Sequence, residues 1–307
     1  MQIEKTDNMW AYFSLNFAVS REESSTKFHS ELVSDVCAGE TSKFVSSTGI
    51  EIYFKNLQWD SEFFGIPIFR VEFVSGSNNS GEPSTSNSFV EFRSFIATAH
   101  TEFYLFAEIP TEESAVLIGM TGGGWRLIET RITSFRDDIQ TFQFLNGHPT
   151  RSAVLADMDS LKATASDAVN PFDRFHADNF FSSNEASKFM ETLIENSING
   201  FADEVLVPAM GPADAFVTGK YLHQLESIGI VAGKNVLTAV SKDRKGWYSH
   251  LIGALCNRFK ERGVGVALVT TQATNRAVFR VLFEHGFRFG RATHIVATYA
   301  RNESKHV

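Results

Sequence analysis

The sequence contains little cysteine, and this scarcity excludes a fold held together by disulfides. Only Cys37 and Cys256 occur among the 307 residues, whereas small secreted scaffolds carry several cysteine pairs. Cys256 lies on the apolar side of a predicted helix, so we expect it to act as a small buried hydrophobic residue.

Long apolar runs and a secretory leader are also lacking. No stretch approaches the roughly 18 apolar residues that a membrane-spanning helix needs, and the sequence begins MQIEKTDNMWAYFS. That beginning has neither the basic nor the apolar region of a secretory signal. We therefore expect a cytoplasmic protein that does not bind membranes.

The motifs of several other protein classes are missing. The nine histidines are scattered without metal-ligand spacing, and no G-x-S-x-G nucleophile motif occurs, so we expect neither a metal nor a covalent acyl-enzyme. The formal net charge of −8 argues against a nucleic-acid-binding protein. This net charge does not exclude a small anionic ligand in a local basic pocket.

The sequence contains 29 phenylalanines, which predict a large aromatic core. Strand-like and helix-like segments alternate along it and indicate a mixed α/β fold. The run NGHPTRS at 146–152 combines turn-forming residues. It predicts a boundary between domains at 1–148 and 149–307. The polar run SGSNNSGEPSTSNS at 75–88 predicts a surface loop.

In the first domain, apolar patterns predict strands over 50–54, 66–73, 103–109 and 125–135, with helices over 89–100 and 112–122. The glycines at 122–124 follow a helix and lack the Lys-Ser/Thr of a phosphate-binding loop, which favours a helix end. A helix, a glycine with an aromatic residue and a strand recur near the C terminus, in HGFRFGRATHIVATY. This similarity suggests the hypothesis that the two domains are diverged copies.

The most informative segment is 237–249. A short apolar strand, LTAV, leads into a basic turn, and a helix is predicted to begin at about Gly246–Tyr248. The unpaired N–H groups and the dipole at such a helix start favour an anion, and Arg244 and Lys245 add positive charge. A diphosphate suits this turn; the alternative is an ordinary turn with solvated basic side chains.

Further along, an apolar run over 264–271 predicts a buried strand. Asn275 is a suitable N-cap for a short helix, and Gly286 suits the left-handed position that ends it. The residues of this segment read T-Q-x-x-N-x-A followed by G-F: Thr271, Gln272, Asn275, Ala277, Gly286 and Phe287.

This pattern resembles the acyl-CoA-binding half of the GNAT superfamily of N-acetyltransferases. The resemblance implies a GNAT fold in the second domain, a smaller and possibly degenerate GNAT-like first domain, and acetyl-CoA as cosubstrate without a metal. It also implies direct attack of an amine on the thioester. The residues that it places around the coenzyme are Leu237, Thr238, Ala239, Val240, Arg244, Lys245, Gly246, Trp247, Tyr248, Ser249 and Asn275.

The sequence departs from the family pattern at two places. Asp243 and Tyr248 stand where the turn usually carries Arg or Gln and a small residue. Leu282 occupies the position of the tyrosine that often protonates the coenzyme thiolate. Tyr248 is then the candidate acid, unless the thiolate leaves unprotonated, and Glu226 is the candidate base.

Two motifs are candidates for the acceptor site: W-D-S-E-F-F-G at 59–65, with Trp59, Asp60, Phe63 and Phe64, and R-F-H-A-D at 174–178, with Arg174 and His176. Stacking aromatics and carboxylates suit a sugar or a base, and Arg and His suit phosphates. The alternatives are core-filling phenylalanines and a surface Arg–Asp pair.

Together these motifs resemble the TDP-fucosamine acetyltransferase group, in separate blocks over about 57–300. That resemblance implies a small-molecule amine acceptor, a TDP-linked 4-amino-4,6-dideoxy sugar, and a possible homodimer. Two other hypotheses stay open: a GNAT protein with a different amine acceptor, and a catalytically weak CoA-binding or interaction protein.

Overall fold

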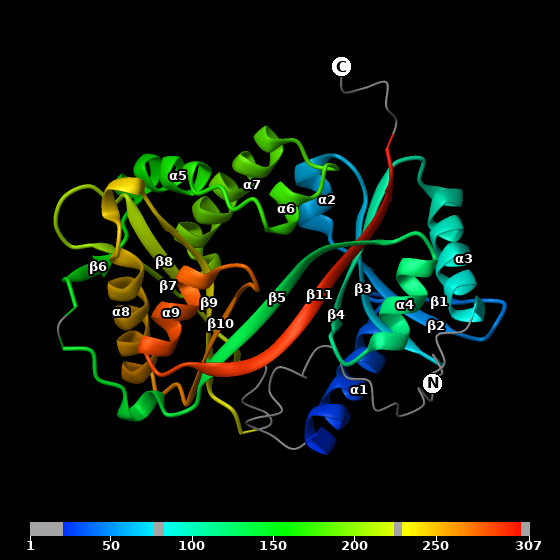
Figure 1. Ribbon diagram of the computed structural model, residues 1–307, viewed down its shortest axis with the longest axis horizontal. Helices are drawn as coiled ribbons and strands as arrows, with labels where there is room; N and C mark the ends of the chain where they lie inside the picture. Colours follow the sequence, from blue (N-terminus) through cyan, green and yellow to red (C-terminus); the bar gives the residue numbers. More distant parts are fainter. Residues whose placement is uncertain (1–20, 77–82, 146, 224–228, 302–307) are drawn as a thin grey trace. The chain divides into compact units, whose positions relative to one another are not determined.

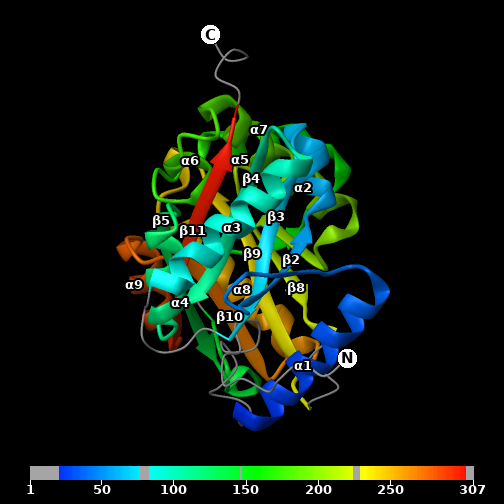
Figure 2. The same ribbon diagram turned by 90° about the vertical axis from the view of Figure 1, so that its right-hand side faces the viewer.

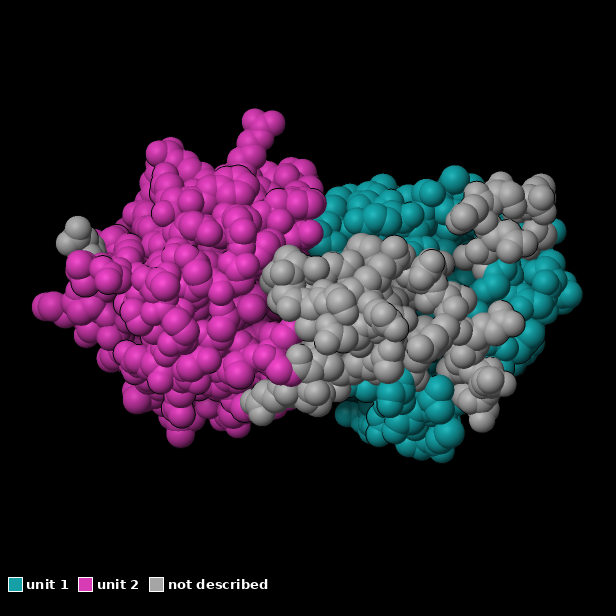
Figure 3. Space-filling model, turned by 90° about the horizontal axis from the view of Figure 1, so that it is seen from below, with its two compact units in different colours: residues 1–131, 291–307 teal, residues 132–290 magenta. Residues whose placement is uncertain are grey.

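The computed structural model describes residues 21–76, 83–145, 147–223 and 229–301. The chain divides into two compact units: unit 1 comprises 1–131 and 291–307, and unit 2 comprises 132–290 (Figure 3). These bounds differ from the predicted 1–148 and 149–307. The reason is that strands β5 (Arg126–Arg136) and β11 (Arg288–Ala300) each begin in one unit and end in the other.

The helices and strands of unit 1 follow one another along the chain, and parts of β5 and β11 also belong to this unit (Figure 1). They are α1 (Arg21–Ala38), β1 (Ser42–Val45), β2 (Glu51–Asn56), α2 (Gln58–Phe64), β3 (Ile68–Ser75), α3 (Pro83–Ala99), β4 (Phe103–Pro110) and α4 (Ser114–Gly122).

Unit 2 contains short 3-10 and π turns in addition to its main elements. The main elements are β6 (Thr150–Ser152), α5 (Met158–Asp167), α6 (Arg174–Ala177), α7 (Ser183–Asn196), β7 (Glu204–Pro208), β8 (Ala215–Tyr221), β9 (Ala232–Val240), α8 (Trp247–Glu261), β10 (Val266–Gln272) and α9 (Arg276–Glu284).

The sheet of unit 1 mixes antiparallel and parallel pairs. Strands β1, β2 and β3 are antiparallel neighbours, β4 runs parallel to β3, and β11 pairs antiparallel with β4 from Thr293–Pro110 to Ala300–Phe103. Helices α3 and α4 contact each other and lie on the same face of this sheet (Figure 2). Buried phenylalanines of α3, Phe89 and Phe92, contribute to the core.

In unit 2, β6, β7, β8 and β9 form antiparallel pairs and β10 runs parallel to β9. Because neighbouring strand residues face opposite sides, Val217 packs with α8 and Phe216 packs with α5 and α7. The β9–β10 register ends at Asn235–Val269, although both strands continue toward their carboxyl ends. The pairing of β9 with β10 therefore ends before β9 reaches the basic turn, whereas its pairing with β8 continues to Val240.

One sequence prediction was wrong in part. Residues 83–88 belong to α3 and do not form a surface loop; residues 77–82 of the predicted loop lie outside the described ranges. The small polar residues there serve helix packing, since a Cβ on Gly119 of α4 would lie 2.5 Å from the Thr85 side chain. Thr85 and Ser88 are buried. A polar composition that looked like a loop thus reflects two helices in close contact.

Other local predictions are confirmed with shifts of a few residues. The expected strands at 103–109 and 125–135 are β4 and β5, and the expected helix at 112–122 is α4. Gly286 has a φ of 76° directly after α9. The order β3–α3–β4–α4–β5 recurs as β9–α8–β10–α9–β11, in agreement with the hypothesis of two diverged copies, which stays a hypothesis.

Candidate functional site

The basic turn is built around Gly246. This residue is the N-cap of α8 and has φ 94° and ψ −16°, in the left-handed region that favours glycine. A Cβ placed there would meet no described atom within 4 Å. Glycine is therefore required by the backbone conformation, and the side of the turn where a side chain would project is open to a ligand.

The guanidinium of Arg244 is bonded to other groups of the protein at this turn. Its Nε donates a 2.7 Å hydrogen bond to Asp214 Oδ1, and Nη2 lies 3.4 Å from the Pro212 carbonyl oxygen. The guanidinium also stacks over Trp247, with 5.2 Å from Cζ to the ring centroid. Arg244 thus ties the turn to the β7–β8 connection, whereas Lys245 is exposed.

The backbone of β9 presents only alternate amides to a ligand. Leu237 N donates to Thr218 Oγ1 at 2.9 Å, and Ser241 N donates to the Asp214 carbonyl at 2.9 Å. Because N–H groups alternate between the two edges of a strand, Leu237 and Ala239 direct theirs toward β8. The amides of Thr238 and Val240 point to the other edge, where the ladder with β10 has ended.

A buried polar network holds β9 at this point, and the sequence prediction missed it. Asn235 Nδ2 donates to the Thr218 carbonyl at 2.9 Å and to Thr238 Oγ1 at 3.0 Å. The register between β8 and β9 shifts between Val217 and Gly219. The one available signal was a polar Asn inside the strand sequence AGKNVLTAV. The network stabilises a β-bulge next to the part of β9 that no longer pairs with β10.

Tyr248 and Ser249 lie in the first turn of α8 with different surroundings. Tyr248 packs against the core of unit 2, and burial raises the pKa of its phenol, which stays protonated at neutral pH. Ser249 Oγ lies 2.9 Å from Nε2 of His285, which follows the last residue of α9. Burial lowers the pKa of His285, and its ring ties α9 to the start of α8.

Asn275 is an N-cap, as predicted. Its Oδ1 accepts from Val278 N at 3.3 Å, and its Nδ2 donates to Thr271 Oγ1 at 3.2 Å. Leu282, in the same helix, is fully buried among core residues of α8 and β10. The position where the family pattern has tyrosine is therefore part of the hydrophobic core.

The segment between α5 and α7 contains a histidine oriented by a carboxylate. Asp173 N-caps α6, and its Oδ2 lies 2.8 Å from His176 Nδ1. Since a carboxylate only accepts, Nδ1 is the donor in this pair, and in the neutral ring Nε2 is then the acceptor nitrogen. The His176 side chain is 6% exposed, and Nε2 has no hydrogen-bond partner among the described residues. Asn170 Nδ2 donates to Gln272 Oε1 at 2.6 Å, which links this segment to the end of β10.

The remaining predicted acceptor residues belong to different units. Trp59, Asp60, Phe63 and Phe64 lie on α2 in unit 1, where Trp59 is 38% exposed and stacks on Phe63 at 6.1 Å. Arg174 is buried in unit 2, with its guanidinium 4.5 Å from the Phe175 ring centroid. Glu226 lies outside the described residues.

No protein-family model and no curated protein matches the sequence. Solved structures do match. A GCN5-related N-acetyltransferase from Sphaerobacter thermophilus has a TM-score of 0.52 at 13% identity, with 82% of this chain and 77% of that chain covered. A conserved protein of unknown function from Staphylococcus epidermidis has a TM-score of 0.55 at 8% identity, with 84% and 94% covered.

A third match is the GCN5-related glucosamine N-acetyltransferase region of a fungal multi-domain GH3 β-N-acetylglucosaminidase, with a TM-score of 0.57 at 10% identity. It covers 83% of this chain and 32% of that longer chain. These similarities show that the chain has the GNAT fold, as predicted; at such low identity they show the fold alone.

Two features are absent from the described residues. None of their helices combines the length and apolarity needed to cross a membrane. In the same ranges, no three His, Cys, Asp or Glu side chains are grouped so that they could hold a metal ion.

Proposed function

We propose that the protein transfers the acetyl group of acetyl-CoA to the amino group of a small molecule. The observation that carries this proposal is the left-handed Gly246 turn at the start of α8, beside the end of the β9–β10 ladder. An open glycine turn supplies backbone N–H groups for a diphosphate. The edge of β9 that no longer pairs with β10 supplies amides for a thioester.

In this proposal the diphosphate of CoA lies at the turn, with Gly246, Trp247, Tyr248 and Ser249 contributing the helix start and Lys245 the exposed charge. The thioester oxygen accepts hydrogen bonds from β9, through the amides of Thr238 and Val240. Such preorganised donors stabilise the charge that develops as the carbonyl is attacked. Asn275, which reaches Thr271, is the proposed contact for the pantetheine arm.

The reaction is a direct displacement. The neutral amine attacks the carbonyl carbon, a C–N bond forms, the C–S bond breaks, and the amine loses one proton. We propose His176 Nε2 as the acceptor of that proton, because Asp173 holds the other ring nitrogen and Nε2 has no hydrogen-bond partner among the described residues. Glu226 remains the alternative base.

The CoA thiolate needs a proton only after it leaves. The Tyr248 phenol stays protonated at neutral pH and is the proposed donor. A thiol with a pKa of about 8.5 also departs unprotonated at a useful rate, so this assistance is an enhancement and not a requirement.

We further propose a TDP-linked 4-amino-4,6-dideoxy sugar as acceptor. The stacked Trp59–Phe63 pair, with Asp60 and Phe64 on the same short helix, suits a sugar or base ring. The glucosamine N-acetyltransferase among the similar structures supports an amino sugar as the acceptor class.

The test is incubation with acetyl-CoA and a panel of TDP-amino sugars, glucosamine and simple polyamines, followed by mass spectrometry. Acetylation of a TDP-amino sugar is expected. Acetylation of another amine alone would keep the reaction and reject the acceptor. The second candidate function, a CoA-binding protein without transfer, is favoured by the apolar Leu282; tight CoA binding with no acetylated product from any amine would support it.

A further inference from the structure

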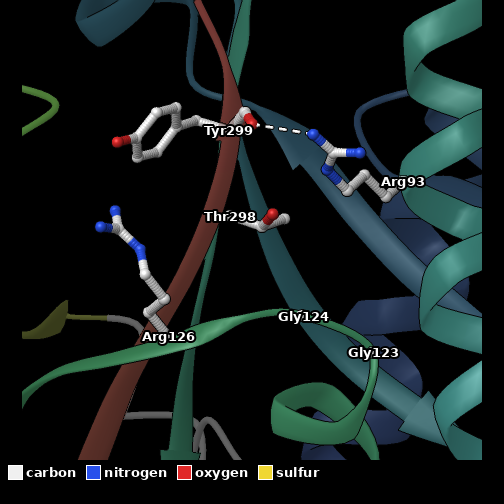
Figure 4. A pocket seen from close by; sticks show the side chains of 6 residues that line it. All are labelled: Arg93, Gly123, Gly124, Arg126, Thr298 and Tyr299. Carbon is white, nitrogen blue, oxygen red and sulfur yellow. Dashed lines mark hydrogen bonds between the residues drawn. The ribbon is translucent and has the colours of Figure 1, made fainter.

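Unit 1 contains a cavity of about 410 Å³ that is open to solvent (Figure 4), and its volume is within the range of roughly 300–1,000 Å³ typical of small-molecule sites. Its walls come from α3, the turn after α4, the start of β5 and the end of β11. The lining residues are Arg93, Gly123, Gly124, Arg126, Thr298 and Tyr299.

Tyr299 orients both cationic side chains of this cavity. Its carbonyl oxygen accepts a 3.1 Å hydrogen bond from Arg93 Nη2, and its ring lies 4.8 Å from the Arg126 guanidinium carbon. Figure 4 shows Arg126 beside the Tyr299 ring and Arg93 reaching the backbone of β11. The bond to Tyr299 uses one of several N–H donors on the Arg93 guanidinium.

The charge of the cavity differs from that of the chain. The sequence has 36 acidic against 28 basic residues, yet the described residues that line the cavity include two guanidinium groups and no carboxylate. Guanidinium groups remain charged at any physiological pH. The cavity therefore favours an anion.

The backbone N–H groups of the two glycines are already used within the turn, and Gly124, unlike Gly123, leaves open space beside it. Gly123 N and Gly124 N donate to the Gly119 and Thr121 carbonyls at the end of α4. A Cβ on Gly124 would meet no described atom within 4 Å, so there is open space next to this residue. A ligand would be held by the two guanidinium groups and by the hydroxyl of Thr298.

We propose that this cavity binds a small molecule that carries a phosphate group. Guanidinium groups pair with phosphate oxygens through two parallel hydrogen bonds, a hydroxyl adds a further donor, and the volume leaves room for an organic substituent. The site lies wholly within unit 1, and it requires neither acetyl-CoA nor acetyl transfer.

Calorimetry with phenyl phosphate, inorganic phosphate and benzoate tests the proposal. Phenyl phosphate should bind most tightly, and Arg126→Gln should weaken its binding about 10-fold or more, since hydrogen bonds to charged groups are the strong ones. Arg280→Gln is the matched control. It removes the same charge from an 81% exposed side chain on α9 in unit 2, and it should leave binding unchanged.

Thr298→Val keeps the shape of a buried side chain and removes its hydroxyl. It should weaken phenyl phosphate binding several-fold while the protein still melts cooperatively. Three results would overturn the proposal: wild-type protein that binds no phenyl phosphate at millimolar concentration, equal binding by the Arg126 and Arg280 variants, or benzoate binding as tight as that of phenyl phosphate.

Discussion

The guanidinium of Arg244 donates to the Asp214 carboxylate at 2.7 Å, and each side chain is only about one-fifth exposed, 20% and 22%. The pair joins the turn before α8 to the connection between β7 and β8. The cation that the sequence suggested for a diphosphate therefore serves the local architecture, and the exposed Lys245 is the cation that remains for the proposed diphosphate contact.

Arg244→Gln and Lys245→Gln should consequently differ. Loss of Arg244 leaves Asp214 without its partner and should lower the free energy of unfolding by about 1–2 kcal/mol. Lys245→Gln should leave stability nearly unchanged and should weaken CoA binding more than pantetheine binding, because only CoA carries the diphosphate. Urea unfolding and calorimetry measure the two effects; a folded Arg244 variant that alone loses CoA affinity would assign the diphosphate contact to Arg244.

Gly246→Ala should lower both stability and CoA affinity. A side chain in the left-handed region costs roughly 1–2 kcal/mol, and a methyl group would project into the open side of the turn. Gly263→Ala is a matched control, since Gly263 has a φ of 74° and an equally open Cβ position beyond the other end of α8. Equal losses of CoA affinity in the two variants would contradict a site at Gly246.

Asn275→Ala should destabilise the protein by about 1 kcal/mol through loss of the cap on α9. Asn275→Asp keeps an oxygen that accepts from Val278 N but removes the amide that donates to Thr271. The Asp variant should therefore retain most of the stability and still bind CoA more weakly. Normal CoA affinity in both variants would leave Asn275 with the capping role alone.

Tyr248→Phe should lower turnover at unchanged CoA affinity. General-acid assistance is typically worth about 10²–10⁴-fold, so a loss near 10²-fold would identify the phenol as the proton donor, and no loss would indicate unassisted departure.

Leu282→Tyr should lower the free energy of unfolding by roughly 1–3 kcal/mol, because a larger side chain must enter a fully packed site. A stable Leu282→Tyr variant would show that this part of the core can adapt.

Stability should fall as the pH drops from 7.5 to 5. Burial lowers the pKa of His285 and, together with nearby His148, that of His250, so the folded state binds these protons less readily than the unfolded chain. The stabilisation that comes from these two histidines is complete above the unfolded pKa of about 6.5 and is lost as the pH falls below that value. The slope is at most about 1.4 kcal/mol per pH unit for each proton.

Thermal denaturation at several pH values measures this slope. His250→Asn keeps an acceptor near the His148 N–H that now bonds Nδ1 at 3.2 Å, and it removes the titrating ring. The slope should decrease in this variant. An unchanged slope would assign the pH dependence to other groups.

Local sequence patterns determined much of the fold. The left-handed glycines, the Asn275 cap and the apolar run of β4 depend on groups within a few residues of one another. Sterics and short-range hydrogen bonds decide such features, so the amino-acid order alone predicts them. The polar start of α3 was misjudged because its Thr and Ser residues pack on the glycines of a later helix.

Only the tertiary structure decided which side chains are engaged inside the protein and which remain exposed. Arg244 meets a carboxylate thirty positions earlier in the chain, Leu282 is enclosed by the core of unit 2, and Arg93 bonds a carbonyl of β11, 206 positions away. The sequence identified the chemical types at these positions. Their roles depend on partners brought together through space, because burial and opposing charge decide whether a cation, a phenol or an imidazole is used internally or offered to a substrate.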